Sequence, residues 1–206
     1  MSDLICENYS LLLVMSRFGL SLGFGDKTVE QVCHQQGVHT ATFLAVVNFM
    51  DDECCASDEY RQEVSIEALM AYLQQAHSYF LDFNLPVIRR KLIDAIDCSQ
   101  DNVAFLILKF YDEYVNEVRA HMEYENQVVF EYVKQLLQGE RVSDYSIAVF
   151  AARHNQIETK LTELKNIIVK YYPSNTNNNL LNSVLFDIYS CEKDLCSHCR
   201  LEDYMF

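Results

Sequence analysis

The sequence HMEYE at residues 121–125 has a histidine and a glutamate four residues apart, and the same pattern returns as HCRLE at residues 198–202. On a helix, a spacing of four residues puts two side chains on the same face, one turn apart. An imidazole and a carboxylate held side by side form a bidentate grip on a transition metal. These two stretches therefore predict helices that carry metal ligands.

Two more histidines, His77 and His154, lie in other segments with strong helical periodicity. Four helices that each supply one histidine, two of them with a glutamate as well, provide the donors that a di-metal site in a four-helix bundle needs. The predicted metal ligands are His77, His121, Glu125, His154, His198 and Glu202. The predicted fold is all-α, with an up-down four-helix bundle.

Composition agrees with long helices. The chain of 206 residues is half hydrophobic and has only 5 glycines and 2 prolines. A chain of this length can build one good-sized core and a small additional module. Scarce glycine and proline favour long helices over turn-rich β structure.

Charge, hydropathy and cysteine content limit the expected partners and location of the protein. The net charge of −14 repels phosphate backbones, so nucleic acid is not an expected partner. The sequence shows neither a secretory signal nor the ~20 consecutive apolar residues of a membrane span. The 8 cysteines are expected to be mostly free thiols in a reduced cytoplasmic protein.

The chain is expected to have three parts: a small helical N-terminal domain at residues 1–50, an acidic linker at 51–64 and the bundle at 65–206. In the first part, helices are predicted at residues 9–18, 28–37 and 40–50. Thr28 and Gln31 have the spacing of a capping box, in which each side chain bonds the other residue's backbone N–H.

The bundle is predicted to begin with a helix from Ser65 that the sequence Asn84-Leu85-Pro86 breaks, followed by a short helix to Ile96. Three longer helices are predicted at residues 101–137, 144–172 and 180–204. The apolar positions of the 101–137 helix include Phe105, Val118 and Val128.

Burial explains why these donors point to a metal. An unpaired carboxylate or imidazole in an apolar bundle costs on the order of several kcal/mol, and coordination satisfies several of them together. Imidazole-rich, carboxylate-containing sites suit iron, and also manganese or zinc. The predicted site has more nitrogen than a ferritin-like Glu-x-x-His site, which favours reaction with diatomic molecules over iron storage.

Other assignments compete with this one. A single histidine on an apolar face is more often a hydrogen-bonded core residue than a ligand. Glu158, four residues after His154, is an alternative third carboxylate ligand, whereas His34 and His39 are expected to be structural or at the surface. Cys196 and Cys199 resemble half of a zinc site, but a structural zinc site usually needs a second pair.

The ligand pattern makes the chain similar to the hemerythrin-like di-iron proteins, and specifically to the repair-of-iron-centres family. Residues 5–49, with Tyr9-Ser-Leu-Leu and Arg17-Phe-Gly19, resemble that family's small N-terminal domain. The six ligands match the family's positions, and the resemblance implies two iron ions bridged by Glu125 and Glu202. One departure is Gly23-Phe24 before Gly25, where the family has an adjacent cysteine pair.

The resemblance implies a non-haem di-iron protein of the nitrosative and oxidative stress response. Such a protein would react with NO or O2 and act on damaged iron–sulfur proteins, and an NO reductase-like or redox activity is left open. The alternative is a sensory input domain for NO, O2 or redox state, with an output domain outside this chain. A third possible function is that of a scaffold whose site holds zinc or no metal. A monomer and a dimer are both compatible with the sequence.

Overall fold

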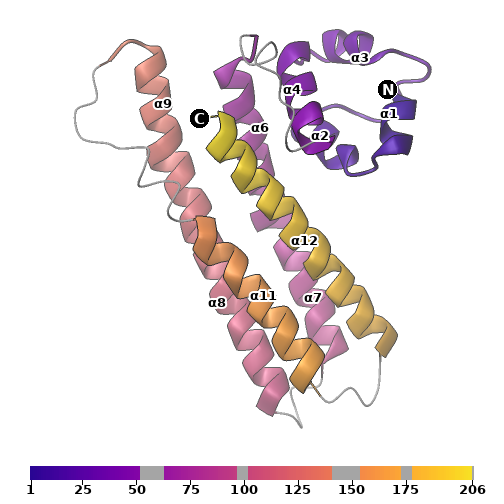
Figure 1. Ribbon diagram of the computed structural model, residues 1–206, viewed down its shortest axis with the longest axis vertical. Coiled ribbons are helices and arrows are strands. Elements are labelled where there is room, and N and C mark those ends of the chain that lie inside the picture. Colours follow the sequence, from indigo (N-terminus) through magenta and orange to yellow (C-terminus); the bar gives the residue numbers. More distant parts are fainter. Residues whose placement is uncertain (52–62, 97–101, 141–153, 173–177, 206) are drawn as a thin grey trace. The chain divides into compact units, whose positions relative to one another are not determined.

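A computed structural model describes residues 1–51, 63–96, 102–140, 154–172 and 178–205. Every regular element in these ranges is a helix, as Figure 1 shows, so the all-α prediction is confirmed. The chain divides into two compact units, Met1–His77 and Ser78–Phe206. The predicted domain limits stay a prediction, because most of the proposed linker lies outside the described residues.

The first unit is built from short helices around an aromatic core. Phe18 lies with its ring centroid 5.4 Å from that of Phe43 and 4.8 Å from that of Tyr72. All three rings come from different parts of the unit, so they tie it together. Its helices are α1 (Ser2–Glu7), α2 (Leu11–Arg17), α3 (Val29–Gln35), α4 (Thr40–Asp51) and α6 (Ile66–Ser78), of which α6 ends one residue into the second unit.

Local side-chain caps fix the starts of two of these helices. The predicted capping box of α3 is present, because Thr28 and Gln31 each accept a hydrogen bond from the other's backbone N–H. At α4, the Nδ1 atom of His39 accepts from the backbone N–H of Thr42, 3.3 Å away. The buried Thr42 hydroxyl in turn accepts from the N–H of Ser65. His39 therefore has the structural role that the sequence predicts for it.

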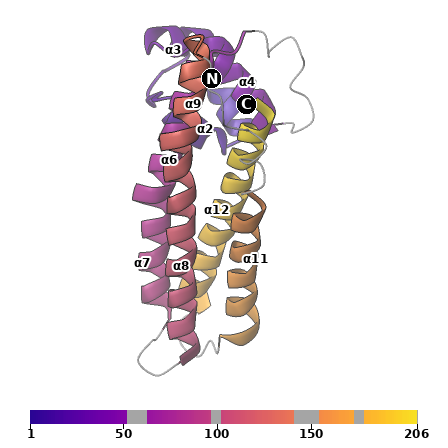
Figure 2. The same ribbon diagram turned by 90° about the vertical axis from the view of Figure 1, so that its left-hand side faces the viewer.

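The second unit contains a four-helix bundle in which α7, α8, α11 and α12 run alongside one another (Figures 1 and 2). Its core consists of the apolar stripes of these helices, for example Ile107, Val118, Leu164 and Ile188. The elements are η1 (Tyr79–Asn84), α7 (Leu85–Ala95), α8 (Asn102–Tyr124), η2 (Glu125–Val129), α9 (Phe130–Leu137), α11 (His154–Tyr171) and α12 (Asn178–Met205).

The predicted helix break at Asn84-Leu85-Pro86 is wrong. The backbone stays helical from α6 through the π-helical turn η1 into α7, and both Asn84 and Leu85 have right-handed helical dihedral angles. Proline lacks a backbone N–H and would disrupt a regular α-helix at this point. The wide π turn, in which the N–H of Leu85 donates to the carbonyl of Phe80, accommodates Pro86 without ending the helix.

The remaining predicted helices are present in the described ranges. The 101–137 helix appears as α8, the π turn η2 and α9, and it ends before Gly139, which has a φ of 78°. Of the predicted helix at 144–172, the described part is α11, and residues 144–153 lie outside the description. No described helix is both long and apolar enough to cross a lipid bilayer.

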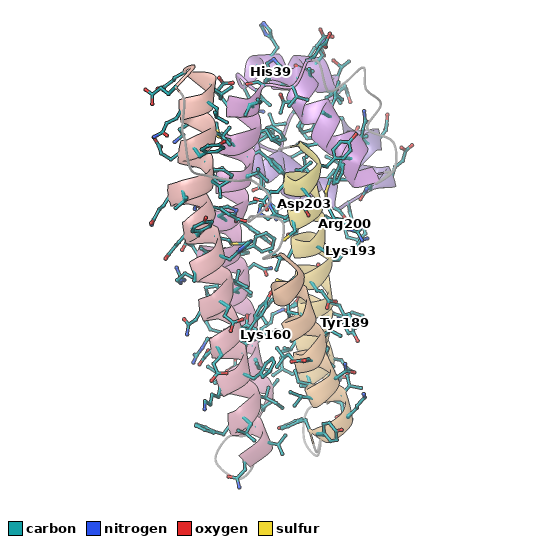
Figure 3. The ribbon with its side chains drawn as sticks, turned by 60° about the vertical axis from the view of Figure 1, so that its left-hand side comes forward. His39, Lys160, Tyr189, Lys193, Arg200 and Asp203 are labelled. Carbon is teal, nitrogen blue, oxygen red and sulfur yellow. The ribbon has the colours of Figure 1, made fainter. Side chains whose placement is uncertain are left out.

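An ion pair links each pair of neighbouring helices in the bundle. Arg89 on α7 holds both carboxylate oxygens of Asp112 on α8, at 2.7 and 2.9 Å. Lys91 on α7 pairs with Asp187 on α12 at 2.6 Å. The other two pairs are Lys160–Glu117, between α11 and α8, and Lys165–Glu192, between α11 and α12. Figure 3 labels Lys160. Together the four pairs form a closed ring around the bundle.

Lys165 has the most buried of these charges, since the residue is 8% exposed. Its ammonium group pairs with Glu192 and lies 4.2 Å from the centre of the Tyr189 ring, which is labelled in Figure 3. The hydroxyl of Thr162 donates to the same carboxylate at 2.8 Å. Glu192 is therefore the centre of a polar network between α11 and α12.

Replacing Glu192 by alanine is expected to lower the free energy of unfolding by about 2–3 kcal/mol, because it leaves a largely buried ammonium group without its carboxylate. Urea unfolding followed by circular dichroism measures the effect. The matched control is Glu113→Ala, which removes an exposed pair with Lys109 and is expected to cost less than about 0.5 kcal/mol. Equal losses in the two variants would contradict the prediction.

Candidate metal centre

Four of the predicted ligands come together in the structure. One donor atom from each residue lies within 4.8 Å of the donor atoms of the other three, and all four side chains are buried. Two atoms that both bind one ion at about 2.1 Å are at most about 4.2 Å apart, so this spacing is close to that of a coordinated metal. The four residues are His77, Glu125, His198 and Glu202.

These donors come from three separate helical segments. His77 is near the end of α6, Glu125 is the first residue of η2, and His198 and Glu202 are one turn apart on α12. Although His77 is the last residue of the first unit, the helix continues through Ser78 into η1. Its position next to the bundle residues of η1 is therefore set by one continuous helix.

The two His-x-x-x-Glu stretches form the side-by-side pairs that their spacing predicts. The Nε2 atom of His121 is 2.8 Å from Oε1 of Glu125, and Nε2 of His198 is 3.3 Å from Oε1 of Glu202. Both glutamates are fully buried. His121 thus reaches the group of four donors through Glu125, although it is not one of the four.

Exposed residues on α12 show how strictly its two faces are separated. Lys193, Arg200 and Asp203, labelled in Figure 3, are exposed, whereas His198 and Glu202 are buried. Glu123 on α8 is likewise exposed, which agrees with the expectation that it faces away from the site.

An aromatic side chain forms one wall of the site. Phe80 is buried, and its ring meets the His198 imidazole edge to face, with the centroids 5.8 Å apart. An apolar wall of this kind restrains the imidazole and keeps water away from it. The helical spacing of the sequence predicts Phe80 on the same apolar stripe as His77, and its burial agrees with this; its contact with His198 depends on the packing of α12 and is not visible in the sequence.

One predicted ligand and one alternative ligand lie at the start of α11. His154 is the first residue of this helix, but its side chain and that of Glu158 lie outside the described part of the chain. The six-ligand assignment therefore stays a prediction, with five of its residues located and four of them in one group.

Two buried tyrosines of α8 lie in the bundle core. The hydroxyl of Tyr111 donates to the carbonyl of Leu85 at 2.8 Å, and burial raises the pKa of both Tyr111 and Tyr114. These phenols therefore remain neutral near pH 7, so they are poor metal ligands. Cys191, Cys196 and Cys199 on α12 are thiols and not parts of a disulfide, and none of them belongs to the donor group.

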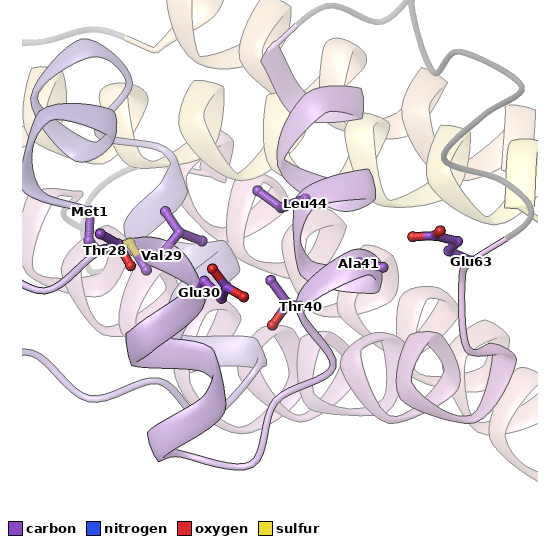
Figure 4. Close-up of a pocket in the computed structure, with 8 residues that line it drawn as sticks. All are labelled: Met1, Thr28, Val29, Glu30, Thr40, Ala41, Leu44 and Glu63. Carbon is purple, nitrogen blue, oxygen red and sulfur yellow. The ribbon is translucent and has the colours of Figure 1, made fainter.

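The first unit contains a separate pocket of about 750 Å³, shown in Figure 4. Among the described residues that line it, those with charged side chains are Glu30 and Glu63, both exposed. None of these described lining residues is a predicted metal ligand. The lining residues are Met1, Thr28, Val29, Glu30, Thr40, Ala41, Leu44 and Glu63.

The donor group has the chemistry of a first-row transition-metal site. Two imidazoles and two carboxylates combine neutral nitrogen and anionic oxygen donors, which suits iron, manganese or zinc. Two fully buried carboxylates so close together repel each other, and a bound cation removes this repulsion. The residues present therefore fit a metal centre.

Comparison with known proteins agrees with this chemistry. The family described as Hemerythrin HHE cation binding domain matches residues 68–206, which include all six predicted ligands. No curated protein and no solved structure was found to match the chain. On the strength of this match over most of its length, the chain belongs to the hemerythrin HHE cation-binding domain family.

Proposed function

We propose that this protein is a cytoplasmic non-haem di-iron protein of the nitrosative and oxidative stress response, of the iron–sulfur cluster repair type. The single observation that carries the proposal is the buried group of two histidines and two glutamates, in a chain of a cation-binding family. A di-iron centre supplies electrons and open coordination positions for NO or O2. Damaged iron–sulfur proteins are the proposed macromolecular partners.

The ligands proposed for the two ions are the six predicted from the sequence. His77, His121, His154 and His198 would supply nitrogen donors, and Glu125 and Glu202 would supply carboxylate oxygens. The Nε2 atom of His121 and Oε1 of Glu125 are 2.8 Å apart, which is close to the separation of two neighbouring donors on one ion at about 2.1 Å.

The protein's remaining contribution is to keep these groups buried among apolar side chains. Phe80 restrains the ring of His198, and the packed bundle keeps bulk water away from both carboxylates. A small apolar gas enters such an interior more readily than an anion does, because an anion loses its hydration. This selectivity supports NO or O2 as the ligand.

The test is anaerobic reconstitution with Fe(II), followed by exposure to NO or O2. We expect an iron-dependent absorption change with either gas, and restored activity of an NO-damaged [4Fe–4S] enzyme mixed with the iron-loaded protein. The matched control is the zinc-loaded chain, which cannot change oxidation state. Gas binding without turnover or repair would favour the sensory alternative, and a chain that takes up only zinc would favour the scaffold.

A further inference from the structure

Two π turns interrupt the helices of the metal site, and each adjoins a predicted ligand. The turn η1 begins at Tyr79, two residues after His77, and η2 begins at Glu125 itself. By contrast, His198 and Glu202 lie in the regular α-helix α12. Single π turns inside α-helices are rare and are found mostly at functional sites.

The burial pattern shows that η2 absorbs one extra residue. In a regular helix with about 100° per residue, Phe130 and Val133 would be rotated from Glu125 by about 140° and 80°. Both are buried, as Glu125 is. If one residue is taken up by the wide turn, the rotations become about 40° and 20°, which puts all three side chains on the same face.

The same calculation applies to η1. Leu85 and Leu92 would be rotated from Phe80 by about 140° and 120° in a regular helix, but by only about 40° and 20° after one residue is absorbed. All three side chains are at most 1% exposed. The widened hydrogen bonds agree, because the N–H groups of Leu85 and Phe130 donate to the carbonyls of Phe80 and Glu125, five residues earlier.

The packing of the bundle does not require these extra residues. A helix with one residue fewer at each point, and without Pro86 after η1, would keep the same buried face and would have the better hydrogen-bond geometry of an α-helix. Both π turns adjoin a donor of the group of four.

We propose that η1 and η2 are metal-positioning elements, each containing one residue that the core does not need. The wide turn sets the backbone of the adjoining ligand, His77 or Glu125, so that its donor atom reaches the group of four. The inference rests on the metal centre proposed above, and it assigns that centre's geometry to two specific backbone turns.

The test is to delete the exposed residue Gln127 from η2. We expect the metal-free variant to be as helical as the unmodified chain and at least as resistant to urea, because the buried face is retained. We expect its affinity for Fe(II), measured by anaerobic calorimetry, to fall at least tenfold. Deletion of the exposed Asp82 from η1, combined with Pro86→Ala so that no proline interrupts the regular helix, is the second variant, with the same expectation.

The matched control is deletion of Asn116, an exposed residue in the regular part of α8. It rotates every later residue of that helix by about 100°, so it is expected to destabilise the metal-free protein strongly. If deletion of Gln127 destabilises the protein as much as this control, the residue is not an extra one and the inference is wrong.

Two other outcomes are equally decisive. Unchanged Fe(II) affinity in both stable deletion variants would show that the π turns do not position the ligands, while the proposed function would stand. Failure of the unmodified chain to bind Fe(II) would remove the proposed function, and the inference with it.

Discussion

Replacing His198 by alanine is expected to lower the iron content of the reconstituted protein from two ions to fewer than one per chain. His198 supplies one of the four donor atoms that lie within 4.8 Å of one another, and alanine leaves Glu202 without its neighbouring imidazole. The remaining carboxylates can bind an ion weakly, but the proposed iron–imidazole bond would be lost from a group of four donors that are all buried. Elemental analysis after anaerobic reconstitution measures the change.

The same loss is expected for His121→Ala, because His121 contacts Glu125 and is a predicted ligand of the pair of ions. His34→Ala is the matched control, since His34 is an exposed histidine on α3 and its removal should leave two ions in place. An oxo-bridged di-iron absorption band should follow the metal content in all three variants. Two irons per chain in either His121→Ala or His198→Ala would disprove the ligand assignment.

Replacing Glu202 by glutamine is expected to have opposite effects on the metal-free and metal-bound protein. Glu125 and Glu202 are both fully buried, with donor atoms at most 4.8 Å apart. Removing one negative charge relieves their repulsion and the cost of burying it, so the metal-free protein should become more stable by about 1–3 kcal/mol. Iron affinity should fall at least about tenfold, because an anionic carboxylate donor is replaced by a weak, neutral amide donor.

Urea unfolding with and without bound iron measures both effects in one experiment. The unmodified chain should gain stability from iron, whereas Glu202→Gln should gain little. Asp203→Asn is the matched control, because Asp203 is the next residue along α12 and is exposed. A Glu202→Gln variant that is stabilised by iron as much as the control would contradict a ligand role for this carboxylate.

The sequence predicts the helices of the bundle well because their apolar residues recur at intervals of three and four. On α12, the buried residues Val184, Ile188, Cys191 and Leu195 continue this pattern directly to His198 and Glu202. The donors of α12 are therefore visible in the sequence as polar residues at buried positions. The capping box at Thr28 was visible for a similar reason, since it depends only on local spacing.

The π turns were not predictable in this way. Val128, Val129 and Phe130 form an apolar run that fits more than one helical phase, and only packing against other helices selects between them. Val128 is 38% exposed, whereas Val129 and Phe130 are buried. The predicted helix break at Pro86 is wrong for a related reason. A proline that would break an α-helix is compatible with a preceding π turn, and the sequence does not show that turn.

Distances within the candidate site also lie beyond what the sequence can provide. Spacing places His121 and His198 on inward faces but does not determine which donor atoms converge. In the structure, His121 is in contact with Glu125, and the group of four takes His77 from another helix. Such convergence depends on how helices distant in the sequence pack together.

The ring of four ion pairs has a consequence for the arrangement of the helices. Each boundary between adjacent helices has its own pair of opposite charges, located on the helices rather than in the connections between them. The helices α7 and α11 supply the cations and α8 and α12 supply the anions, so two helices that became neighbours with the same sign would repel each other. These charges therefore favour a bundle in which α7 lies diagonally opposite α11, whatever the loops that connect the helices.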